Sequence, residues 1–362
     1  MVIATISLLC AMLIGFAAHR ASLCNVRAVA ELLNSGSSHM LRSLMQAVLW
    51  MATLGGVLTL VFGVSTHSVG TRTPAIWALA GGWIFGLGAA LNGGCSLSTL
   101  HRLADGEIGM AATLIGLGLG VLSWPSLATL GPWPALTSVP SPWLRWPDLA
   151  PWALLALLAW TVWRLRALHR QARRSTAGGW GARMLAPSYP LAAGAALLGL
   201  GGGWLFAMQG PWSYSGFMRE LLLHRQEGAP QPATFHALLV MALVGGMAAS
   251  AWQRGSVRWR RPGGALPWAR HAVGGALMGL GAAMLPGGND TLLLAALPQL
   301  TTTAAMAYAS LLLGIATGLL MLRFAQVPMT SFSCDASGCT DAPPQRPSLT
   351  ADTPPNSTRR RA

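Results

Sequence analysis

Five consecutive residues, Asn92-Gly93-Gly94-Cys95-Ser96, carry the most chemically specific pattern in this sequence. Paired glycines allow a backbone to approach a ligand closely and to offer successive N–H groups. A half-helix beginning at Ser96 would also place its positive N-terminal end beside Cys95, and such an end attracts anions. We therefore predict that this loop contacts a small anion. The alternative for Gly93 and Gly94 is close helix packing.

A second cysteine lies in the segment from His19 to Arg27, where Arg20 and Arg27 flank Cys24. Arginine at membrane depth is costly and therefore suggests function, here attraction or gating of an anion. The alternatives are that both arginines are interfacial residues and that Cys24 is a small apolar side chain.

A third segment, Pro286-Gly287-Gly288-Asn289-Asp290, resembles the Cys95 loop but has Asn289 where the cysteine would be. We expect Gly287, Gly288 and Asn289 to line the same path. Asp290 is a good N-cap for the helix that follows. An anion path would require Asp290 to be paired or turned away.

Arg102 has two candidate roles: an ion pair with Asp105 or Glu107 that fixes the loop, or reception of the anion. Cys10 is predicted to be a core residue. Cys334 and Cys339 form only a weak metal or redox pattern, and the sequence contains no phosphate loop, hydrolase triad or zinc signature. We therefore predict no metal site and no cofactor.

The composition places these loops in a membrane. Charged residues are only 9% of the 362 residues and apolar types are 53%, so charges are too few to cover a soluble enzyme. Disorder is excluded by the same hydrophobicity. All 24 basic residues are arginines, concentrated in short connectors, which is the pattern of membrane topology and not of nucleic-acid binding.

Uncharged stretches predict about nine transmembrane helices. They lie near residues 1–18, 43–64, 74–91, 108–130, 150–163, 189–208, 234–252, 271–285 and 301–322. Nine spans put 20 of the 24 arginines on one side of the membrane. The positive-inside rule then places the N-terminus in the periplasm and the C-terminus in the cytoplasm.

An internal repeat organises these spans. Gly86–Leu100 resembles Gly279–Leu293, and Gly15–Leu33 more weakly resembles Gly203–Leu222. Because one span separates the halves, the second half must be inverted. The predicted units are a first half (1–130), a linker span with an Arg-rich loop (131–187), a second half (188–323) and a disordered tail (324–362).

Polar or Gly/Pro-rich interruptions follow four of the spans and predict re-entrant loops or half-helices. They lie at residues 20–31, 92–107, 209–220 and 286–299. Irregular backbone at membrane depth requires cover by protein or a water-filled path. Loops that enter from both faces would leave a narrow waist near the midplane.

The motifs GFAAHRASLCNVRA (residues 15–28) and GLGAALNGGCSLSTLHRLADGEIGM (residues 86–110) resemble the YeeE/YedE family of bacterial inner-membrane proteins. The resemblance implies an hourglass-shaped transporter of sulfur-containing ions such as thiosulfate, with cysteines along its central path. It would place Cys95 at the constriction and Cys24 on the cytoplasmic side. A soluble sulfur carrier is an implied partner. This chain departs from the family pattern at Asn289, where a third functional cysteine is expected.

The resulting prediction is an all-α, non-enzymatic carrier of a small sulfur-containing anion, which binds through transient S–H and N–H contacts. An alternative is a membrane sulfurtransferase that carries persulfide on Cys95 or Cys24, or a selenium-related membrane protein. A further alternative is a scaffold whose motifs only pack helices.

Overall fold

A computed structural model describes most of the chain. It covers residues 2–64, 67, 69–72, 76–129, 136–139, 142–174, 184–227, 234–285, 287–326, 331–335 and 338–342. The predicted Pro286 lies outside these residues.

A helix is present at each of the nine predicted spans. They are α1 (Val2–Ala21), α3 (His39–Leu60), α4 (Ile76–Asn92), α6 (Gly109–Ala128), α8 (Ala150–Arg174), α10 (Leu191–Gln209), α12 (Thr234–Arg254), α13 (Ala265–Met284) and α15 (Thr302–Phe324). Long apolar segments form helices because a helix satisfies its own backbone hydrogen bonds. Within the described chain, seven helical segments are long and apolar enough to cross a membrane. The two helices that fall short are α8 and α13, since arginines reduce their hydropathy.

Shorter helices follow four of the long ones, at the predicted interruptions. They are α2 (Asn25–Ser35), α5 (Ser96–Ala104), α11 (Tyr214–Glu227) and α14 (Asn289–Thr291), the last continuing as a π-helical turn, η1 (Leu292–Ala296), and a 3-10 turn, η2 (Leu297–Gln299). Positive φ angles at Ser22, Gly93, Gly210 and Gly287 mark the breaks. In the last segment the break is followed by irregular helical turns, which fit the predicted choice between a re-entrant loop and a half-helix.

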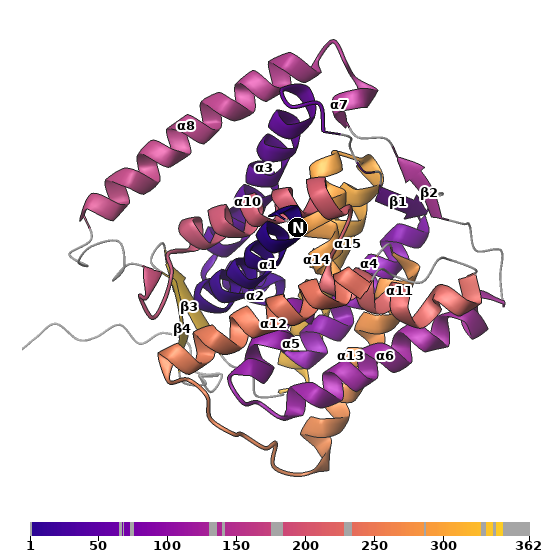
Figure 1. Ribbon diagram of the computed structural model, residues 1–362. Helices are drawn as coiled ribbons and strands as arrows, with labels where there is room; N and C mark the ends of the chain where they lie inside the picture. Colours follow the sequence, from indigo (N-terminus) through magenta and orange to yellow (C-terminus); the bar gives the residue numbers. More distant parts are fainter. Residues whose placement is uncertain are drawn as a thin grey trace, which may run out of the picture.

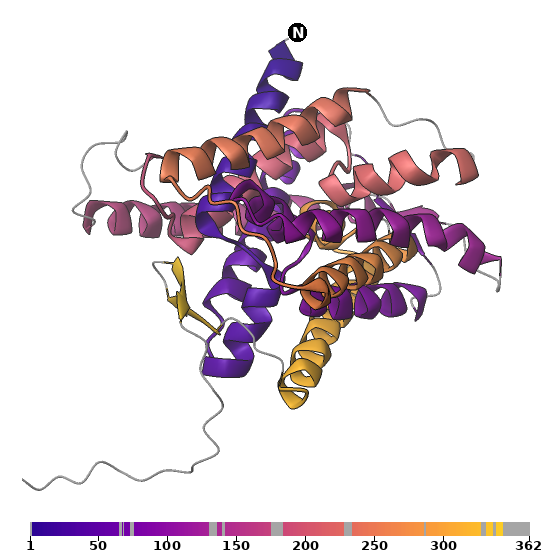
Figure 2. The ribbon, with the colours of Figure 1, turned by 90° about the horizontal axis from the view of Figure 1, so that it is seen from below.

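Eight of these nine helices, all except α8, form two rows of four. In one row α15 packs on α4, α4 on α13 and α13 on α6, and in the other α3 packs on α10, α10 on α1 and α1 on α12. Each row therefore has one helix from each half at its centre. Figure 1 shows α4, α13 and α6 together and α1 beside α10 and α3, and Figure 2 shows the same bundle turned by 90°.

Small residues allow these helices to approach closely, and the pairs that face each other show the relative directions of the helices. A Cβ atom on Gly281 would lie 2.6 Å from the Gly81 carbonyl oxygen, and one on Gly274 would lie 2.9 Å from the Gly88 carbonyl oxygen. Residue numbers rise along one helix as they fall along the other, so α4 and α13 are antiparallel. The same test makes α1 and α10 antiparallel, because Gly194 faces Ala21 and Gly201 faces Ile14.

Four short strands and two further helices lie outside the rows. β1 (Val69–Arg72) pairs antiparallel with β2 (Leu136–Val139), and β2 is followed by the short helix α7 (Pro142–Arg145). α8 packs on α3 and runs along the edge of the molecule (Figure 1). Within the range of the predicted tail, β3 (Ser331–Asp335) pairs antiparallel with β4 (Gly338–Ala342).

Candidate functional site

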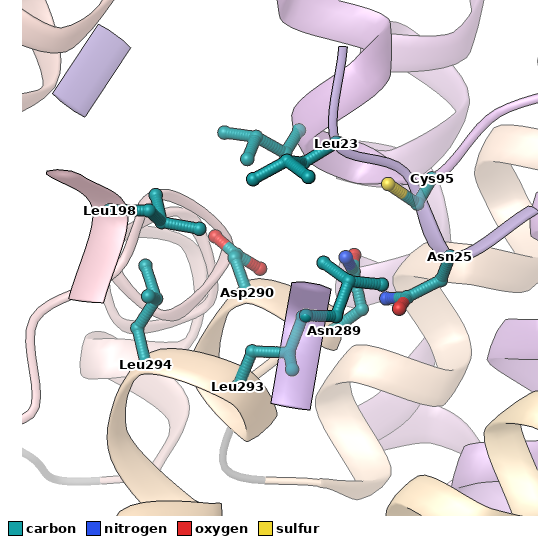
Figure 3. Close-up of a pocket in the computed structure, with 10 residues that line it drawn as sticks. Leu23, Asn25, Cys95, Leu198, Asn289, Asp290, Leu293 and Leu294 are labelled. Atoms are coloured by element: carbon teal, nitrogen blue, oxygen red, sulfur yellow. The ribbon is translucent and has the colours of Figure 1, made fainter. Parts of the chain in front are cut away.

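Three of the four short helices, α2, α5 and α14, begin around a small cavity, and α11 contacts its edge through Ser215 and Asp290. Its lining includes Asn25 at the start of α2, Cys95 just before α5, and Asn289 and Asp290 at the start of α14. Leucines close the other sides, as Figure 3 shows. The cavity volume is about 10 Å³, enough for one water molecule. Residues far apart in the sequence, near positions 23–25, 95–97 and 289–294, therefore line one small cavity.

The buried side chains of Cys24 and Cys95 are neighbours, close enough for the two thiols to influence each other. Cys24 is the N-cap residue of α2 and Cys95 that of α5, and neither side chain caps its own helix. Both are almost fully buried, at 2% and 1% exposure.

Asn92 fixes the loop that carries Cys95. Its amide donates to the Gly94 carbonyl at 2.9 Å, and its own oxygen accepts from Thr113 at 2.7 Å. The N–H groups of Gly93 and Gly94 donate to the Ala90 and Ala89 carbonyls. The expectation that these glycines offer free N–H groups to a ligand is therefore wrong, because both amides close the end of α4.

The two re-entrant segments are joined across the cavity by Ser96. Its hydroxyl donates to Asn289 Oδ1 at 2.7 Å and reaches Asp290 Oδ1 at 3.3 Å. Asn289 is the first residue of α14, whereas Cys95 precedes the first residue of α5. By helix position Asn289 therefore corresponds to Ser96, the residue to which it is hydrogen-bonded, and not to Cys95.

The sequence suggested Asp290 as the N-cap of the helix that follows it, but Asp290 does not cap that helix. The N-cap of α14 is Gly288, and the Asp290 carboxylate instead accepts the Ser215 backbone N–H at 2.9 Å and the Ser215 hydroxyl. Ser215 lies in the first turn of α11, so Asp290 occupies the positive end of that helix. This carboxylate is paired, as an anion path requires, but it also lines the cavity.

Several polar residues of the site were missed in the sequence. The Ser213 hydroxyl caps α11 through the Gly216 N–H at 3.0 Å and bonds Thr291 at 2.5 Å. Tyr308 donates to Asn25 Oδ1 at 2.8 Å and leaves the buried Asn25 Nδ2 without a partner in the described part of the chain. The Ser-Tyr-Ser pattern at the third interruption is the only sequence signal that pointed here.

The three predicted arginines take different positions. Arg20 is buried, donates to Ser250, Gln253 and the Ala186 carbonyl, and lies 4.3 Å from the Phe16 ring centroid. It therefore holds α1 against α12. Arg27 is half-buried near His101. Arg102 pairs with Glu107 at 2.7 Å, the first of its two predicted roles.

A Ser-His-Asp chain joins α12, α1 and the end of α5. His19 contacts the Ser250 hydroxyl at 3.0 Å and Asp105 at 3.1 Å. Burial raises the pKa of Asp105, but hydrogen bonds from His19 and Ser256 outweigh it and hold that pKa below its ordinary value. Ser250 is fully buried and also bonds Arg20, so the chain fastens three helices and does not present a nucleophile.

The fold, in which long apolar helices carry short broken segments that meet at a buried cavity, is that of a polytopic membrane protein. The chain belongs to the Sulphur transport family, whose profile matches residues 20–317. It is 25% identical over 272 residues to the thiosulfate transporter TsuA of Spirochaeta thermophila, covering 65% of this chain and 74% of that protein. It is also 32% identical over 103 residues to the thiosulfate transporter TsuA of Escherichia coli K12, covering 28% of each.

Proposed function

We propose that this protein imports thiosulfate, or a closely related sulfur-containing anion, across the bacterial inner membrane. The observation that carries the proposal is the buried Cys24–Cys95 pair at the junction of the re-entrant segments. Two relatives named thiosulfate transporters support the substrate class. Weak S–H donors suit transport, because a site must hold an ion without trapping it.

Converging helix starts would supply the remaining stabilisation. α2, α5 and α14 begin at the cavity, α11 begins next to it, and the positive end of a half-helix favours an anion. Asp290 already occupies the start of α11. The starts of α2 and α5, beside the two thiols, are therefore the positions for the substrate. Because the cavity holds only about one water molecule, passage requires the waist to widen.

Helix directions favour nine crossings in two inverted halves. If α1, α3, α4, α6 and α10 each cross once, then α1 and α10 can be antiparallel only if α8 crosses as well. The antiparallel pair of α4 and α13 requires α13 to cross for the same reason. The packing is also unchanged when the halves are exchanged, since α4 lies on α15 as α13 lies on α6. With the arginine distribution, this favours a periplasmic N-terminus and a cytoplasmic tail.

Asn289 distinguishes this chain from a path with three thiols. Its oxygen accepts from Ser96, so its amide N–H groups are directed away from that hydroxyl. We propose that these N–H donors serve the anion where the third thiol would stand.

The test is uptake of radiolabelled thiosulfate by cells that lack their own importers. Cys95→Ala and Cys24→Ala should abolish uptake, because each removes one thiol of the buried pair. Cys10→Ala is the matched control, since Cys10 lies within α1 and away from the cavity. Uptake by Cys95→Ala at the parental rate would refute the proposal. Mass spectrometry of the parent protein separates the sulfurtransferase alternative, which requires a persulfide on Cys95 or Cys24.

A further inference from the structure

An open point next to Gly93 is faced by two positive side chains. Gly93 has a φ of +76°, and the position where a Cβ would stand has only two heavy atoms within 4 Å outside its own chain neighbours. They are Nη2 of Arg270 at 3.8 Å and Nη1 of Arg102 at 3.9 Å. One arginine comes from α5 and the other from α13, so each half of the protein contributes one.

Both side chains are held by their other nitrogen atoms. Arg102 donates from Nε to Glu107 at 2.9 Å, and its Nη2 lies 2.7 Å from the same carboxylate. Arg270 donates from Nε to the Leu91 carbonyl at 2.6 Å. Nη1 of Arg102 and Nη2 of Arg270 take no part in these contacts and lie near one point, so the contacts need not change when a ligand arrives. Such preorganisation favours binding.

The excess of positive charge around Gly93 also favours the binding of an anion. Glu107 is shared between Arg102 and Arg260, whose Nη1 lies 3.6 Å from it. Arg270 forms no ion pair within the described residues, although arginine in a membrane helix is costly without a partner or a function. Two guanidinium groups that face the same open point repel each other unless an anion lies between them.

We propose that Arg102 and Arg270 bind one tetrahedral oxyanion over Gly93. Guanidinium groups suit this ligand because their planar N–H forks match oxyanion geometry. The ligand class is a sulfur or phosphorus oxyanion, either free in solution or in the headgroup of an anionic lipid. The further assignment of this site as an exit site, on the proposed cytoplasmic side of the waist, rests on the proposed function. The binding of an oxyanion by the two arginines does not rest on it.

Sulfate is the probe, because it has the oxygen atoms but no sulfane sulfur for the thiols. It is titrated calorimetrically into the purified full chain in uncharged detergent. Arg270→Gln should weaken sulfate binding about tenfold or more, the loss expected for one charge-assisted hydrogen bond. Arg270→Lys should fall between the two, since it keeps the charge but not the fork. Arg261→Gln is the matched control, because Arg261 is exposed and belongs to the same Arg-rich side.

Equal sulfate affinity in the parent and Arg270→Gln would overturn the site, as would equal weakening by Arg261→Gln. Unfolding temperatures of all variants exclude misfolding as the cause. Cys95→Ala should retain sulfate binding while it loses uptake, so failure of this site and failure of the transport proposal give different results.

Bilayers with and without phosphatidylglycerol identify the occupant. Sulfate binding in both bilayers assigns the site to a free anion. If sulfate binding disappears with phosphatidylglycerol, and Arg270→Gln retains less of that lipid in native mass spectrometry, the occupant is a lipid phosphate. Both results support an oxyanion site.

Discussion

Removal of the Asp290 carboxylate tests whether it holds the two broken helices of the second half together. Asp290→Ala leaves the Ser215 N–H without its acceptor at 2.9 Å and takes an anion from the start of α11. A buried donor without a partner costs about 1–3 kcal/mol, and the charge at a helix end contributes about 0.3–1 kcal/mol. The Ser96 hydroxyl keeps Asn289 as an acceptor. We therefore expect a loss of about 1–4 kcal/mol in the free energy of unfolding.

Asp290→Asn should lose less, about 1–2 kcal/mol, because it keeps one acceptor oxygen but turns an NH2 group toward the Ser215 N–H or the Ser215 hydroxyl. The assay is reversible unfolding in mixed micelles with increasing SDS. Glu31→Gln is the matched control, since Glu31 is a buried acid that accepts the His39 and Met40 N–H groups at the start of α3, away from the cavity. It should lose comparable stability and keep uptake. Stability of Asp290→Ala within 0.5 kcal/mol of the parent, a margin typical of neutral surface substitutions, would refute the reasoning.

Three further predictions use other contacts. Gly281→Ala should lower the free energy of unfolding in SDS by about 1–3 kcal/mol, because the added Cβ would overlap the facing helix. The control Gly245→Ala should be neutral, because its Cβ would meet no atom within 4 Å. Equal effects of the two substitutions would contradict the packing. The pKa of Asp105 is lowered in the folded protein, so its stabilisation is present above the unfolded value of 3.8 and is lost as pH falls through the lower folded value. Asp105→Asn should therefore reduce the dependence of the unfolding temperature on pH in this range. An unchanged pH dependence would argue against the shift. In a variant without the other cysteines, diamide should take two electrons and two protons from Cys24 and Cys95, and the resulting disulfide should stop uptake until dithiothreitol reduces it. Continued uptake by the crosslinked protein would show that the pair lies off the path.

The helices and their breaks could be predicted because their signals are local. A charge ends an apolar run wherever the run lies in the fold, so α3, α6 and α12 begin and end within a few residues of the predicted spans. The breaks follow from local chemistry too, since Gly93 and Gly210 adopt positive φ angles. α13 was predicted as a span but is not among the seven segments apolar enough to cross a membrane, and its Arg270 donates to the Leu91 carbonyl of α4.

The roles of single polar residues could not be predicted in the same way. Asp290 matches an N-cap by type and position, yet its partner is Ser215 in another helix. The glycine pair looked like a source of free amides, but those amides bond carbonyl groups of α4. A hydrogen-bonding group takes whichever partner the packed helices bring closest, and local sequence does not specify that partner.

By itself, the sequence determined that this is a helical membrane protein with four interrupted spans, because lipid accepts only backbone that is satisfied within its own helix. It also identified the two cysteines at the breaks. The tertiary structure alone decided that Cys24 meets Cys95, that Ser96 reaches across to Asn289, and that Arg270 faces Gly93. These contacts join residues far apart in the chain, and they exist only because glycines let the long helices approach closely enough to bring the broken segments to one point.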